Sequence, residues 1–125
     1  MESIYAIRGA IDTDFDGVAS IDRDVKILMD RLYEENDITD EDVAFIIFSQ
    51  TDDLRSRNAA AAFRAGGKGS TVPLFCVKEA EIYGAMPRVI RVMVVINHAR
   101  RKEPRHVYLG QTANLRPDLQ EGSEG

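Results

Sequence analysis

The sequence predicts one α+β (mixed α/β) domain in which helices pack on a five-stranded mixed sheet. Two observations support this fold class. Apolar runs of strand length alternate with two helical segments early in the chain, and connections through helices favour parallel pairing of strands. Two further apolar runs follow without an intervening helix, which predicts a mixed sheet. With 125 residues, the chain can bury a core without disulfides or metal.

The first strand is predicted at residues 4–9, a largely apolar run that ends at a glycine. The first helix is predicted to end near Asn36, because apolar residues recur with helical spacing between Val25 and Tyr33. We expect Ser20 to cap the start of this helix, since serine favours that position.

Residues 43–49 form a continuous apolar run, which is typical of a strand covered on both faces. Thr39, just before it, is expected to cap a brief helical turn. Residues 58–65 predict a second, alanine-rich helix that ends at Gly66 and Gly67.

Three more strands are predicted at residues 72–76, 89–96 and 106–109. Pro73 lies near the start of the third strand, where proline is tolerated. The run 89–96 is apolar at both its odd and its even positions, which face opposite sides of a strand, apart from Arg91. A small domain with such strands is expected to bury sheet surface against a partner subunit.

The net charge of −5 is unevenly distributed. Residues 1–53 hold fifteen acids and four Lys/Arg, a net of −11, whereas residues 54–125 hold six acids and twelve Lys/Arg, a net of +6. Two solvated faces are the favoured interpretation, and an anionic ligand held by the second half is the functional one. Nucleic acid is less favoured, because aromatic residues are not interleaved with the basic ones.

Several classes of protein are excluded by what the sequence lacks. No apolar run could cross a bilayer, and the first residues do not resemble a signal peptide. The lone Cys76 cannot form an internal disulfide, so a cytoplasmic location is expected. Two histidines are too few for a metal site, and no phosphate loop, dinucleotide fingerprint or catalytic triad motif is present. We therefore expect no metal and no cofactor.

Arg91 is the most informative polar position. It shares a strand face with Val89, Met93 and Val95, and a buried guanidinium must be paired. A core carboxylate, or a side chain that reaches past the strand end, explains it about as well as a ligand does. Arg8 precedes the glycine that ends the first strand, and ligands collect at strand ends in parallel sheets. Together the two arginines are candidates to bind a dianion through their planar guanidinium groups.

Other candidate residues remain open to two interpretations. Cys76 has no base nearby in sequence, so a small buried hydrophobic residue is the favoured interpretation. Glu79 could be a surface acid or could accept a hydrogen bond from a ligand hydroxyl. Tyr108 could be a half-buried aromatic or could offer its phenol to a ligand. Arg64 and Arg116 could each be a solvated charge. From the residues alone, the prediction is an α/β domain that binds a small anion.

Several segments, taken together, resemble one family. The segments are Ile7-Arg8-Gly9-Ala10, Thr51-Asp52-Asp53-Leu54, Val72-Pro73-Leu74, Pro87-Arg88-Val89-Ile90-Arg91-Val92, Arg105-His106-Val107-Tyr108-Leu109 and Leu115-Arg116-Pro117-Asp118-Leu119. Their order and spacing are similar to those of the trimeric α/β-barrel chorismate mutases, from residue 4 to about 119. The resemblance implies one domain over residues 1–119, and the polar residues 120–125 are expected to form a frayed tail.

This resemblance implies both an assembly and a reaction. Each subunit would be a five-stranded mixed sheet with helices, and three subunits would form a pseudo-α/β-barrel with active sites in the clefts between them. The reaction would be the Claisen rearrangement of chorismate to prephenate, toward phenylalanine and tyrosine. Because this rearrangement is unimolecular, it needs no nucleophile, metal or redox cofactor. Catalysis would depend on holding a compact conformer and stabilising the charge that separates.

The resemblance also implies roles for individual residues. Arg91 would bind the ether oxygen, where negative charge grows, and Arg8 would bind a carboxylate. Tyr108 would add a hydrogen bond to a carboxylate, while Glu79 and Cys76 would meet the ring hydroxyl. The walls and entrance of the cleft would be formed by Phe75, Val77 and Lys78 and by Arg64 and Arg116.

Two other functions are compatible with these residues. One is a catalytically silent trimer that binds an anion of the aromatic pathway, although binding alone would not require an arginine at the breaking bond. The other is a small RNA-associated protein that uses the basic second half. We expect neither nucleic acid nor membrane to be the partner.

Overall fold

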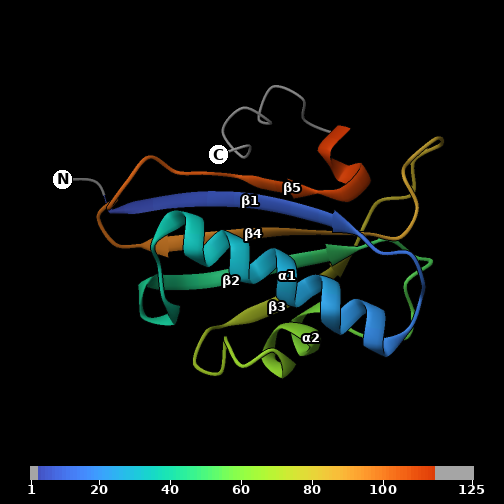
Figure 1. Ribbon diagram of the computed structural model, residues 1–125, viewed down its shortest axis with the longest axis horizontal. Helices are drawn as coiled ribbons and strands as arrows, with labels where there is room; N and C mark the ends of the chain where they lie inside the picture. The colour runs from blue at the N-terminus through green and yellow to red at the C-terminus, as the bar shows by residue number, and fades with distance from the viewer. Residues whose placement is uncertain (1–2, 115–125) are drawn as a thin grey trace.

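The computed structural model describes residues 3–114 and forms a sheet with two helices (Figure 1). The elements, in chain order, are β1 (Ile4–Asp12), α1 (Val18–Asn36), η1 (Asp40–Asp42), β2 (Val43–Gln50), α2 (Ala59–Ala65), β3 (Leu74–Lys78), β4 (Val89–Asn97), β5 (Val107–Leu109) and η2 (Gly110–Asn114), where η marks a 3-10 helix. The expected tail at residues 120–125 lies outside the described residues.

The five strands form one mixed sheet in the order β3-β2-β4-β1-β5, which confirms the predicted fold class. Strands β2 and β3 are parallel, as are β1 and β5, while β4 is antiparallel to both β1 and β2. Strands β1 and β2 therefore run in the same direction without pairing, because β4 lies between them. This central position suits β4, because apolar residues occupy positions on both faces of the strand.

Both helices pack on one face of the sheet (Figure 1). A Cβ at Gly9 would lie 2.8 Å from Cδ1 of Leu32 in α1 and 3.0 Å from the carbonyl oxygen of Val107. Gly9 therefore allows the helix to approach β1 closely. The prediction that this glycine ends the first strand is wrong, since β1 continues to Asp12.

Of the two predicted N-terminal caps, the one at Thr39 is confirmed and the one at Ser20 is not. Helix α1 begins after Gly17, and the prediction that Ser20 caps it is wrong. Ser20 lies inside the first turn, and its hydroxyl donates to the carbonyl of Phe15 at 3.1 Å. Thr39 does cap η1, in a reciprocal capping box with Asp42.

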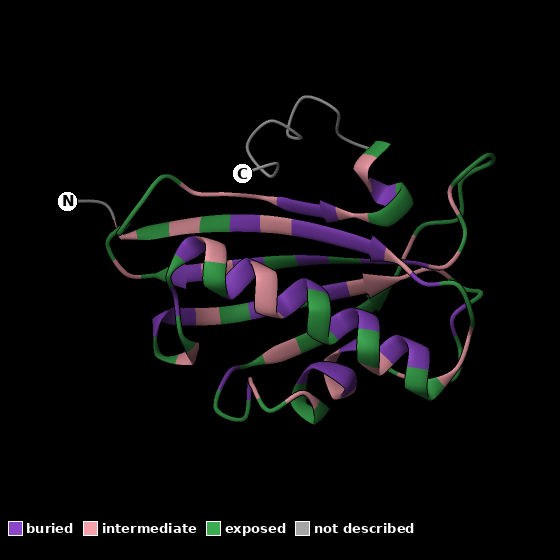
Figure 2. Ribbon diagram, viewed as in Figure 1, coloured by how far each residue is buried: buried purple, intermediate pink, exposed green. Residues whose placement is uncertain are grey.

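Neither α1 nor α2 covers the second face of the sheet (Figure 1), and the strands alternate between buried and exposed positions (Figure 2). Several of the exposed positions on this face are apolar. This open face includes the exposed side chains of Ile4, Phe45, Ile47, Phe75, Val77 and Met93. The prediction that residues 43–49 are covered on both faces is wrong for the single chain, because every second residue of β2 faces outward. Exposed apolar surface of this extent commonly marks a contact with another protein.

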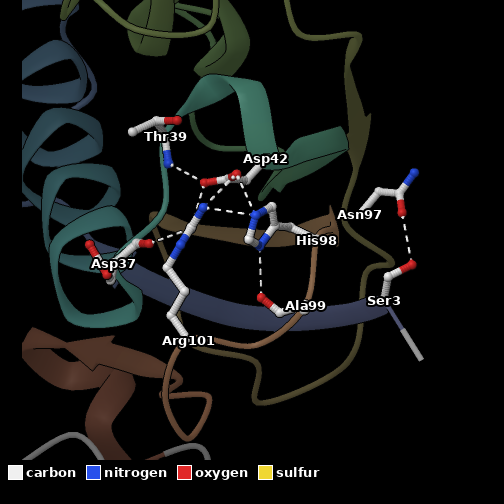
Figure 3. Close-up of polar contacts among 8 residues, drawn as sticks. All are labelled: Ser3, Asp37, Thr39, Asp42, Asn97, His98, Ala99 and Arg101. Atoms are coloured by element: carbon white, nitrogen blue, oxygen red, sulfur yellow. Dashed lines mark hydrogen bonds and ion pairs between the residues drawn. The ribbon is translucent and has the colours of Figure 1, made fainter. Parts of the chain in front are cut away.

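Ion pairs join the acidic and basic parts of the chain. Lys68 bridges to Asp30 at 2.6 Å, and Arg101 bridges to Asp42 at 2.8 Å. Figure 3 shows the buried Asp42 carboxylate, which accepts hydrogen bonds from the guanidinium group of Arg101 and from the backbone N–H of Thr39. These contacts pair acids of the first half with bases of the second half within one domain.

Within residues 3–114 no helix is both long enough and apolar enough to span a membrane. Nor do the described His, Cys, Asp and Glu side chains gather anywhere into a group that could hold a metal ion.

Candidate active site

One row of paired residues crosses all five strands on the open face. Val77 on β3 pairs with Ser49 on β2, which pairs with Arg91 on β4. Arg91 in turn pairs with Ala10 on β1, and Ala10 pairs with Tyr108 on β5. Because directly paired residues point to the same face of a sheet, the side chains of Ser49, Arg91 and Tyr108 share the open face.

Arg8 lies in the next row, where it pairs with Met93 of β4. Its backbone N–H donates to Nδ1 of His106 at 3.0 Å, which ties β1 to the start of β5. The expectation that Arg8 stands at a strand end is wrong, since β1 continues for four residues beyond it. Its place in the middle of the strand nevertheless puts its side chain on the same face as Arg91.

The two rows enclose a shallow pocket of about 260 Å³. Its lining consists of Arg8, Gly9, Ile47, Ser49, Arg91, Val92, Met93 and Tyr108. Two guanidinium groups and a phenol thus surround a floor of apolar side chains. This combination suits a small organic anion, because the arginines match carboxylates and the apolar floor matches a ring.

Glu79 directly follows β3 and pairs with Arg91, whose Nε lies 3.2 Å from Glu79 Oε2. The same oxygen accepts a hydrogen bond from the Ser49 hydroxyl at 2.7 Å. The guanidinium is not buried as expected from its strand, because the Arg91 side chain is 47% exposed in this chain. Since Nε makes the ion pair, the terminal nitrogens of Arg91 are the ones suited to meet a ligand.

The remaining residues predicted on β3 divide between the two faces. Phe75 and Val77 lie on the open face, where they pair with Ile47 and Ser49. Cys76 pairs with the fully buried Phe48 and therefore points to the helix face, where its Sγ contacts Gln50 Oε1 at 3.1 Å. Burial raises the pKa of the Cys76 thiol, so the structure offers no activated thiolate there.

Two predicted basic residues, Lys78 and Arg64, are not brought to the pocket by this chain. Lys78 pairs with Asp52 and Glu81 at the surface. Arg64, on α2, donates to the carbonyls of Gly69 and Val72, each at 3.4 Å, before β3 begins. Arg116 lies outside the described residues.

Sequence reasoning missed two residues of this region, Ser49 and His106. Ser49 is the last residue of the run 43–49, and no role is predicted for it from the sequence. A signal was available, because Ser49 has the strand parity of Ile47 and so had to share its face. His106 lies in one of the segments that resemble the family, but no local pattern pairs it with Arg8, which is 98 residues away.

Comparisons with known proteins agree with this geometry. The family model described as chorismate mutase type I matches residues 4–119. The chorismate mutase AroH of Thermus thermophilus is 38% identical over 119 residues, covering 94% of this chain and 97% of that protein. The chorismate mutase AroH of Bacillus subtilis (strain 168) is 35% identical over 117 residues, covering 93% of this chain and 92% of that protein.

A solved structure extends the likeness from sequence to fold. The chorismate mutase from Clostridium thermocellum Cth-682 superposes with a TM-score of 0.83 at 31% identity, covering 88% of this chain and 98% of that chain. The family-model match over residues 4–119 includes the strands that carry Arg8, Arg91 and Tyr108. On these grounds the chain belongs to the chorismate mutase type I family.

Proposed function

We propose that this protein is a chorismate mutase, an isomerase that rearranges chorismate to prephenate in the biosynthesis of phenylalanine and tyrosine. The observation that carries the proposal is the convergence of Arg8, Arg91 and Tyr108 around one pocket on the open face. Chorismate carries two carboxylates and an ether oxygen, and these groups match the two guanidiniums and the phenol.

Arg91 is the residue that we expect to act on the transition state. As the ether C–O bond breaks, negative charge grows on the oxygen, and a preorganised guanidinium stabilises this charge more than it stabilises the substrate. Arg8 and Tyr108 would bind carboxylate oxygens and hold the compact conformer in which the reacting carbons approach each other. Glu79 would keep the Arg91 guanidinium oriented and would accept a hydrogen bond from the ring hydroxyl.

The active form that we propose is a homotrimer with sites at the subunit interfaces. The exposed apolar residues of the open face support it, since association would remove them from water. Arg64 and Cys76 would reach a ligand only from a neighbouring chain that brings its own α2 and β3 to the pocket. We further propose the reducing cytoplasm as its compartment, where the free thiol of Cys76 would persist.

The test is to follow the loss of chorismate absorbance with purified protein. Arg91→Ala is expected to lower kcat about 10²–10³-fold, since loss of one preorganised donor typically costs about 3–4 kcal/mol. The matched control is Arg100→Ala, because Arg100 stacks on Tyr5 away from the pocket and its loss should leave kcat unchanged. Full activity of Arg91→Ala would refute the mechanism.

The competing function is a trimer that binds an aromatic-pathway anion without turning it over. It predicts tight binding of prephenate or chorismate by calorimetry together with no absorbance loss. That pair of results would replace the enzymatic proposal.

A further inference from the structure

Arg88 has an unusual backbone conformation, with φ of 53°. It immediately precedes β4, and Arg91 follows three residues later. Within residues 3–114, the other non-glycine residue with positive φ is Asp37, which occupies the ordinary left-handed position at the end of α1. An arginine is strained in this region, and such strain persists only where the surroundings hold it.

Asp53 supplies the contacts that hold Arg88. Its carboxylate accepts the Arg88 backbone N–H, with Oδ1 at 3.2 Å and Oδ2 at 3.0 Å. The hydroxyl of Thr51 donates to Asp53 Oδ1 at 2.6 Å and accepts the N–H of Val89 at 3.0 Å. The backbone N–H of Thr51 donates to the carbonyl of Val89 at 3.1 Å. The turn after β2 is thereby fastened to the first residues of β4.

A second contact restrains Arg88 from the other side. The N–H of Thr13 donates to the Arg88 carbonyl at 2.9 Å, and the Arg88 Nε donates back to the Thr13 carbonyl at 2.9 Å. The peptide planes on both sides of Arg88 are therefore held. Because successive side chains of a strand alternate between faces, the direction in which β4 starts decides where the Arg91 side chain points.

We propose that Thr51 and Asp53 are positioning residues that act through the strained Arg88 to hold Arg91 against Glu79. The inference deepens the proposed function and rests on it, because it takes Arg91 as the residue that meets the substrate. Neither Thr51 nor Asp53 lines the pocket of Arg8, Arg91 and Tyr108. Both line a neighbouring pocket that Glu79 also borders, and their hydrogen bonds to Arg88 and Val89 give them a path to Arg91 along the backbone.

The experiment compares Asp53→Ala, Arg88→Gly and the double variant. Asp53→Ala is expected to lower kcat for chorismate about tenfold, with a smaller change in KM, because Arg91 acts mainly in the transition state. Glycine adopts φ of 53° without strain, so Arg88→Gly should restore most of the lost kcat in the Asp53→Ala background. A merely structural role for Asp53 would lower the stability of the protein and leave kcat of the folded fraction unchanged.

The matched control is Asp52→Ala. Asp52 is the neighbouring acid, and its carboxylate pairs with the exposed side chains of Lys78 and Arg55. Its loss should leave kcat unchanged. An unaltered kcat in Asp53→Ala, or a double variant as slow as Asp53→Ala, would overturn the positioning role.

An activity-independent measurement separates this inference from the proposed function. The Nε–H resonance of Arg91 reports its pairing with Glu79, so it should move in Asp53→Ala and return in the double variant. If the parent protein leaves chorismate unchanged, the proposed function fails while this measurement still decides the positioning role. A resonance that does not move in Asp53→Ala refutes the role whatever the activity.

Discussion

Ser49, Glu79 and Arg91 form the contact on which the chemistry of the pocket depends. One carboxylate oxygen of Glu79, Oε2, accepts a hydrogen bond from the Ser49 hydroxyl at 2.7 Å. The same oxygen lies 3.2 Å from the Arg91 Nε, with which it forms an ion pair. The other oxygen thus stays available to a ligand hydroxyl. Ser49 therefore does more than end an apolar strand, because it decides how Glu79 faces the guanidinium.

Removing the hydroxyl in Ser49→Ala should lower kcat/KM about tenfold, because a hydrogen bond to a charged group contributes about 1.5–3 kcal/mol. Ser49→Thr keeps a hydroxyl and suits a strand, so it should retain most of the activity. Steady-state kinetics with chorismate measures both variants. Equal loss in the two would show that volume at this position matters and that the hydrogen bond does not.

At the scale of elements, one buried carboxylate joins three segments of the chain. Asp42 lies in η1, and its carboxylate accepts hydrogen bonds from two other segments (Figure 3). One comes from the guanidinium of Arg101, in the connection after β4, and the other from the backbone N–H of Thr39. The same guanidinium donates to the carbonyl of Asp37 at the end of α1 at 2.7 Å. The hydrogen bond from Arg101 is the main reason that the pKa of Asp42 falls from 3.8 to about 2.

The depressed pKa gives this contact a defined pH dependence. The folded state favours the carboxylate, so the stabilisation is fully present above pH 4 and is lost as the pH falls toward 2, by roughly 2 kcal/mol at most. Arg101→Met should remove most of this acid-dependent part and lower the free energy of unfolding at pH 7. Urea unfolding at pH 7, 4 and 2.5 measures the effect.

The neighbouring Arg100→Met serves as the control, since Arg100 packs on the Tyr5 ring whereas Arg101 pairs with Asp42. It should keep the acid dependence of the parent protein. If Arg101→Met and the parent lose stability in parallel as the pH falls, the assignment to Asp42 is wrong.

For the whole molecule, the decisive asymmetry is between the two faces of the sheet. One face is covered by α1 and α2 (Figure 1). The other face presents exposed apolar side chains, and the pocket lies among them. Long-range ion pairs such as Arg57 with Asp22 at 2.8 Å join the basic and acidic parts of the chain. Association through the open face would then be governed by apolar contact more than by net charge.

Phe45→Glu should therefore disrupt the proposed trimer, because a carboxylate would be placed on the open face at a position outside the pocket lining. Ile27→Glu is the matched control: Ile27 is 45% exposed and Phe45 is 41% exposed, but Ile27 lies on α1. Light scattering should give a smaller mass for Phe45→Glu alone. A trimer in both variants, or a monomeric parent, would contradict the proposed assembly.

Much of the fold was predictable because local patterns determine it. The apolar stripe of α1, the alanine-rich α2 with its glycine stop, and the five apolar runs were each visible as periodicity or propensity. The errors occurred where a distant contact prevails over a local rule. Gly9 looked like a strand end, yet it serves the approach of Leu32.

The sequence by itself determined the types and order of the elements, the lack of a familiar metal or phosphate motif, and the resemblance that names Arg8 and Arg91. Only the tertiary structure decided that β4 separates β1 from β2 and that one sheet face stays open. The tertiary structure also placed the Ser49 hydroxyl within hydrogen-bond distance of Glu79, and the Asp53 carboxylate within hydrogen-bond distance of the Arg88 backbone N–H. The physical reason is that strand order and side-chain partners depend on contacts between residues far apart in the chain, which periodicity does not encode.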